Sequence, residues 1–74
     1  MTEIRDKKLL KRFGSQLRKL RTQRKWTMEE LANKADIEIS QVHRIESGQV
    51  NTTLSTLNAL SKALSIPLKT LMDF

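Results

Sequence analysis

The sequence of 74 residues predicts one small all-α domain, and two observations support this fold class. Apolar side chains recur three and four residues apart in several separate stretches, which is the spacing of one face of an α-helix. Short polar connections separate these stretches, and no stretch has the character of a strand, a repeat or a low-complexity segment. We therefore expect residues 1–6 to be a flexible, polar N-terminus and residues 7–74 to form a single domain.

The first predicted helix is long and has one continuous apolar face. Leu10, Phe13, Leu17 and Leu20 are spaced three, four and three residues apart. Gly14 lies inside this helix, where it costs about 1 kcal/mol relative to alanine. A close approach of a second helix would explain a glycine at this position. Trp26 follows the helix, and we expect its large ring to pack in the core.

Residues 27–48 predict two short helices joined by a tight break at residues 36–37. The first begins with Thr27 and Glu30, whose spacing is that of a capping box. Its inward face consists of Leu31, Ala32 and Ala35. The second, over residues 38–47, turns Val42 and Ile45 inward and carries too little apolar surface to serve only as core. Two such helices at a steep angle form a helix-turn-helix.

Two further helices are predicted in the remaining part of the chain. Thr53 is a good N-cap for a fourth helix, because its hydroxyl can accept a free backbone N–H. The apolar face of this helix is expected to be Leu54, Leu57, Leu60 and Leu64. Pro67 suits the first position of a last short helix.

Composition excludes several classes of function. The chain has no cysteine, and the single His43 cannot form a metal site alone, so we expect no metal, no cofactor and no disulfide. The usual acid-base and thiol devices are missing, which argues against an enzyme. No apolar run reaches the roughly 20 residues of a membrane span, and no signal peptide is evident, so we expect a cytoplasmic protein without a membrane partner.

The charge is distributed unevenly along the chain. Residues 1–25 hold ten basic and two acidic side chains, a net charge of +8, whereas residues 26–74 hold four basic and six acidic ones. Such asymmetry favours a polyanion as partner. The alternative is that the first helix is merely a solvated charged surface.

The helix-turn-helix region carries a specific family resemblance. The run A-D-I-E-I-S-Q-V-H-R-I-E-S-G, residues 35–48, resembles the A-G-[IV]-S-x-x-x-[IV]-S-x-[IWY]-E-x-G pattern of the phage Cro/cI-type, or XRE, family. The flanking runs L-R-K-L-R and N-T-T-L-S-T-L-N-A-L-S-K-A-L-S-I-P-L are similar to that family as well. The resemblance implies a five-helix, lambda-repressor-like DNA-binding domain that regulates transcription. Asp36, Glu38 and Met28 depart from the family's usual Gly, Ser or Thr, and Gln.

The resemblance also implies which residues contact DNA. The second helix of the motif enters the major groove, and its base-contacting positions fall on Ile39, Ser40 and Arg44, with Gln41 beside them. The predicted phosphate contacts lie at the two helix starts, on the third helix and in the polar loop, and they are Thr27, Met28, His43, Gln49, Asn51, Thr52 and Thr53. Alternatives are that Ile39 covers the edge of the core and that Arg44 forms a surface salt bridge.

Two structural expectations complete the sequence-based picture. The family pattern places Arg21 of the first helix against Glu46 at the end of the third, which predicts an internal ion pair. The alternative is that both side chains are exposed and independent. The C-terminal apolar residues exceed what a short helix can bury, so we expect a homodimer on a palindromic operator, formed by Leu68, Leu71, Met72 and Phe74.

The precise role of such a regulator stays open at this stage. A repressor, an autoregulator, an antitoxin with a toxin as partner, and a restriction-modification controller all fit the sequence. The rival class is a protein- or membrane-interaction module that uses the basic first helix. The rival requires residues 7–25 to carry the binding, whereas DNA recognition requires Ser40 and Arg44.

Overall fold

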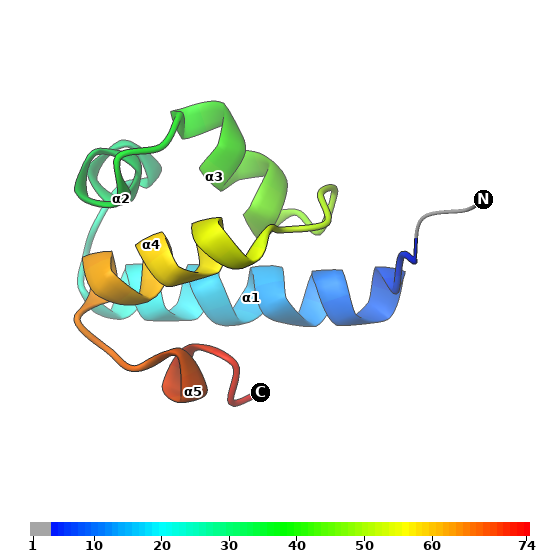
Figure 1. The fold of residues 1–74 in the computed structure, drawn as a ribbon. Helices are drawn as coiled ribbons and strands as arrows, with labels where there is room; N and C mark the ends of the chain where they lie inside the picture. Colours follow the sequence, from blue (N-terminus) through cyan, green and yellow to red (C-terminus); the bar gives the residue numbers. More distant parts are fainter. Residues whose placement is uncertain (1–3) are drawn as a thin grey trace.

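The computed structural model describes residues 4–74, and all regular structure within this range is helical (Figure 1). The five helices are α1 (Lys7–Gln23), α2 (Met28–Ala35), α3 (Ile39–Glu46), α4 (Leu54–Leu64) and α5 (Leu68–Leu71). Figure 1 shows α5 on the opposite side of α1 from α2 and α3, with α4 running across the middle of the domain. The predicted five-helix, all-α fold is confirmed. Within the described range, no helix combines the length and apolar character needed to cross a membrane.

The helix starts follow from local side-chain chemistry. Asp6 caps α1, because its carboxylate accepts a hydrogen bond from the Leu9 N–H at 3.0 Å. Thr27 and Glu30 form the predicted capping box of α2, and Thr53 caps α4. Pro67 precedes α5 as its N-cap, one residue earlier than the predicted first helical position. The side chain of Glu38 makes no capping hydrogen bond at the start of α3.

Three helices are followed by a left-handed residue that is not glycine. These residues are Lys25, Asp36 and Ser65, with φ of 60°, 56° and 56°. A left-handed residue lets the chain turn sharply and satisfies carbonyl groups at the helix end. Asp36 therefore makes the tight break of the helix-turn-helix in the place where the related pattern has glycine.

The core lies between α1, the helix-turn-helix and the two C-terminal helices. Its fully buried side chains come from all five helices and are Leu17, Leu31, Val42, Ile45, Leu60, Leu64 and Leu71. Trp26 packs partly buried against this core. Two cations lie over its ring, with the guanidinium carbon of Arg24 5.7 Å and the ammonium nitrogen of Lys34 4.8 Å from the ring centroid.

Leu54 does not belong to the buried face of α4, contrary to the prediction. Its side chain is 72% exposed. Each residue of an α-helix advances by about 100°, so two consecutive steps of three residues place Leu54 about 120° around the helix from Leu60. The apolar face of α4 therefore turns away from the core at the N-terminal end of this helix.

The segment before α1 contacts the loop between α3 and α4. Asn51 Nδ2 donates to the Ile4 carbonyl at 2.9 Å, and the Arg5 guanidinium donates to the Gln49 carbonyl at 3.2 Å. Of the predicted flexible segment 1–6, residues 1–3 lie outside the described residues. The flexibility of this segment stays a prediction.

Candidate nucleic-acid interface

The helix α3 is held against α1 at a very short distance. A Cβ atom added to Gly14 would lie 2.5 Å from the carbonyl oxygens of both Ile45 and Glu46. Only glycine fits there without displacement of one helix, which explains the residue that the helical pattern alone would disfavour. Val42 and Ile45 complete the contact by burying their side chains in the core.

An ion pair fixes the end of α3 to α1. Arg21 Nε donates to Glu46 Oε2 at 2.6 Å, and a second guanidinium nitrogen donates to Oε1 at 3.0 Å. The side chains of Arg21 and Glu46 are only 10% and 3% exposed. Arg21 also donates to the Trp26 carbonyl at 2.7 Å, so one side chain joins α1, α3 and the linker before α2.

The outer surface of α3 presents most of the residues predicted to contact bases. Ile39 is 48% exposed and lies outside the core cluster, and Ser40 and Arg44 are exposed as well. Arg44 takes part in no ion pair within residues 4–74. An aliphatic group, a hydroxyl and a guanidinium therefore face outward together from a helix that is fixed on its inner side. This set can pack on a thymine methyl and hydrogen-bond to base edges.

Gln41 differs from the other predicted base contacts. It is half-buried, and its Nε2 donates to Thr56 Oγ1 on α4 at 3.4 Å. Thr53 Oγ1 donates to the same Thr56 oxygen at 2.9 Å, and Thr56 N–H donates back to Thr53 Oγ1 at 3.2 Å. The amide of Gln41 is thus turned toward α4, where it links the recognition helix to the start of α4.

The predicted phosphate contacts in the loop are engaged to different degrees. Gln49 is exposed, whereas the amide of Asn51 is hydrogen-bonded to Ile4. The hydroxyl of Thr52 is buried, and it has no hydrogen-bond partner among the residues that the structure describes. Thr53 is exposed and caps α4. The side chains of this loop are therefore less available to a phosphate than their polarity indicates.

A shallow hollow brings the start of α2 close to the end of α3. It is lined by Arg18, Met28, His43, Glu46 and Ser47. Met28 and His43 were predicted as phosphate contacts, but Arg18 was not. The sequence feature that could have indicated Arg18 is its spacing from Arg21. Arg18 precedes Arg21 by three residues, so the two residues lie on the same side of α1.

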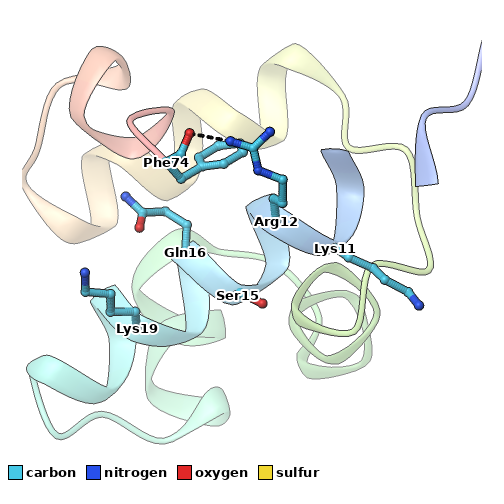
Figure 2. A pocket seen from close by; sticks show the side chains of 6 residues that line it. All are labelled: Lys11, Arg12, Ser15, Gln16, Lys19 and Phe74. Carbon is cyan, nitrogen blue, oxygen red and sulfur yellow. Dashed lines mark hydrogen bonds between the residues drawn. The ribbon is translucent and has the colours of Figure 1, made fainter. Parts of the chain in front are cut away.

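The C-terminal residues predicted to form a dimer contact are mostly packed within the domain. Leu71 is fully buried, Leu68 and Phe74 are half-buried, and Met72 is 39% exposed. The Phe74 ring lies 6.2 Å from the Phe13 ring. Arg12 covers the Phe74 ring and donates to its carbonyl at 2.8 Å (Figure 2). Leu71 can therefore not contact a partner directly, and Met72 is the most available of the four.

The described residues of this region do not form a metal site. Within residues 4–74, no group of three histidine, cysteine or acidic side chains is placed to hold an ion.

Comparisons with known proteins agree with the helix-turn-helix fold. A family model described as Helix-turn-helix matches residues 17–71. The chain is 39% identical over 61 residues to the HTH-type transcriptional repressor RghR of Bacillus subtilis (strain 168), a match that covers 81% of this chain and 45% of that protein. The chain thus spans less than half the length of this repressor.

Two solved structures have the same fold. The restriction-modification controller protein C.AhdI of Aeromonas hydrophila matches with a TM-score of 0.81 and 38% identity, over 86% of this chain and 96% of that chain. The hypothetical transcription factor NHTF of Neisseria matches with a TM-score of 0.82 and 25% identity, over 97% of this chain and 84% of that chain.

Proposed function

Because the chain belongs to the helix-turn-helix family of DNA-binding transcriptional regulators, we propose that it binds double-stranded DNA sequence-specifically and represses transcription. The observation that carries this proposal is the outward placement of Ile39, Ser40 and Arg44 on one anchored helix. Repression is favoured by the relative named as a transcriptional repressor, and a controller role by the neighbour named as a restriction-modification controller protein.

The proposed reading of DNA assigns each exposed side chain a role. Arg44 donates two hydrogen bonds to guanine O6 and N7, Ser40 bonds to either base class, and Ile39 packs on a thymine methyl. Backbone N–H groups at the start of α2, together with His43 and Gln49, bind phosphates and fix the register. Gln41 supports the helix through its hydrogen bond to Thr56.

We also propose that the protein acts as a homodimer on a palindromic operator. The exposed side chains of Leu9 and Met72 and the half-buried side chain of Leu57 line one hollow of about 110 Å³ where α1, α4 and the end of α5 meet. A single short recognition helix makes few base contacts, and a two-fold dimer doubles them with half-sites about 34 Å apart.

The experiment is selection of bound duplexes from a random pool, followed by binding of single variants to the enriched sequence. We expect an enriched motif with two-fold symmetry. Arg44→Ala should weaken binding to this motif, whereas Lys19→Ala, which removes a charge on the far side of α1, should leave the motif unchanged. An unenriched pool, or a motif that Arg44→Ala and Ser40→Ala bind like the wild type, would overturn sequence-specific reading by α3.

A further inference from the structure

Three exposed cations of the N-terminal part of the chain lie beside α3 and the loop after it. Arg18 lines the hollow that also contains His43 and Ser47, at the end of α3. Lys11 lies against the next residue, since a Cβ atom on Gly48 would be 2.8 Å from Lys11 Cγ. As the chain runs from Ser47 to Gly48, the neighbouring cation changes from Arg18 to Lys11, so the two segments run in opposite directions.

The third cation continues this order. The Arg5 guanidinium donates to the carbonyl of Gln49 at 3.2 Å, so its charge is placed at the loop itself. Arg18, Lys11 and Arg5 thus lie beside residues 47, 48 and 49 in turn. Seven residues, or two helical turns, separate Lys11 from Arg18, which places their backbones about 10.5 Å apart on one side of α1.

The other side of α1 has a different environment. Arg12, Gln16 and Lys19 line a hollow with Phe74, which Lys11 borders as well. Gln16 donates to the carbonyls of Thr70 and Asp73. Figure 2 shows the side chain of Lys11 pointing away from Phe74 and Lys19. Arg12 and Lys19 therefore lie on the flank of α1 that faces α5, and Arg18 lies on the flank that faces the end of α3. Lys11 borders both flanks, and its side chain points away from Phe74 (Figure 2).

The acidic side chains near Arg5, Lys11 and Arg18 do not form ion pairs with these three cations. Glu46, which lines the same hollow as Arg18, is bonded to Arg21. Asp6 accepts the backbone N–H of Leu9. Within residues 4–74, the one ion pair is that of Arg21 with Glu46. None of Arg5, Lys11 and Arg18 forms an ion pair within residues 4–74, so each can pair with an external anion.

We propose that Arg5, Lys11 and Arg18 form a cationic edge that follows the DNA phosphate backbone beyond the recognition helix. This inference rests on the proposed DNA binding and adds a set of phosphate contacts that the helix-turn-helix itself does not contain. The edge contributes affinity without sequence preference, because phosphates carry no base information. It also compensates for two loop side chains that are less available to a phosphate, namely Asn51, which is hydrogen-bonded to Ile4, and Thr52, whose hydroxyl is buried.

The test measures the salt dependence of DNA binding. The probes are the duplex enriched from the random pool and a random-sequence duplex of equal length, and affinity is followed by fluorescence anisotropy at several salt concentrations. The variants Arg5→Gln, Lys11→Gln and Arg18→Gln each remove one charge from an exposed side chain and keep its polar character. The matched control is Lys19→Gln, which removes the same charge from the flank of the same helix that faces α5.

Each variant of the edge should reduce the slope of log affinity against log salt by about one per protomer, since each neutralised phosphate contributes about 0.9. The loss of affinity should be the same factor on both duplexes, and Lys19→Gln should retain the wild-type slope. Equal slopes for Lys19→Gln and the three variants would overturn the edge, as would wild-type slopes throughout. A wild type that binds neither duplex would instead refute the proposed function.

Discussion

Arg21 Nε lies 2.6 Å from Glu46 Oε2, in a pair that is almost completely excluded from solvent. The hydrogen bond that Arg21 donates to Glu46 raises the pKa of Arg21, and burial opposes this shift. Because the folded pKa lies above an already high unfolded value, the stabilisation that this shift represents is complete at neutral pH and is lost only in strong alkali. The link between α1 and α3 is therefore insensitive to the titration of Arg21 across the physiological range.

Removing one partner of this pair should destabilise the domain strongly. Glu46→Ala leaves the guanidinium of Arg21 buried without its anion, and the cost should be about 3–5 kcal/mol of unfolding free energy. Urea denaturation followed by circular dichroism measures this loss. The double variant Arg21→Met with Glu46→Leu should lose less than Glu46→Ala alone, because no charge is left unpaired. A midpoint unchanged by Glu46→Ala would contradict the role of the pair.

Gly14→Ala should be destabilising although alanine is the better helix former. The added methyl would lie 2.5 Å from two carbonyl oxygens of α3, which are backbone atoms and cannot turn away. Overpacking of this kind costs about 1–3 kcal/mol and outweighs the gain of about 1 kcal/mol in helix propensity. Ser15→Ala, at an exposed position of the same helix, is the control and should be neutral or slightly stabilising. Thermal melts of both variants give the comparison, and equal melting temperatures would argue against a close contact.

Arg44→Ala should weaken binding to the selected duplex by about 1–3 kcal/mol and relax preference at one base position. The physical reason is the loss of a bidentate pair with guanine from an exposed guanidinium that no acidic side chain holds. Competition between duplexes that differ at single positions identifies the base concerned. Equal loss on selected and random duplexes would reduce Arg44 to a phosphate contact.

Thr56→Val should weaken specific binding without a large change in stability. The valine keeps the shape of threonine but cannot accept the hydrogen bond from Gln41, so the start of α3 loses its link to α4. The expected loss is about 0.5–1.5 kcal/mol on the selected duplex and little on a random one. Thr56→Ser restores the hydroxyl and should restore affinity. If Thr56→Ser behaves like Thr56→Val, the hydroxyl has no positioning role.

Local patterns and the family resemblance anticipated the helices, the capping box and the ion pair, because each depends on short spacing or on a motif. The orientation of Gln41 could not be anticipated, since it depends on a hydroxyl 15 residues away on α4. The exposure of Leu54 follows from two consecutive steps of three residues, which place it about 120° around α4 from Leu60, and the sequence-based prediction did not take this rotation into account. The cations beside the α3–α4 loop were visible as charge, but their division between two flanks of α1 required the packed structure.

Dimerisation should depend on Met72 rather than on Leu71. Leu71 is fully buried, so Leu71→Glu would unfold the protomer and could not test an interface. Met72→Glu places one negative charge beside Leu9 and Leu57, which line the same hollow, and burial of that charge in an interface would be costly.

Thr70→Glu adds the same charge at an exposed position of α5 and serves as the control. Sedimentation equilibrium should show a wild-type dimer, a dimeric Thr70→Glu variant and a monomeric but folded Met72→Glu variant. A wild type that stays monomeric at high micromolar concentration, and binds a half-site as well as a palindrome, would remove the basis for the dimer.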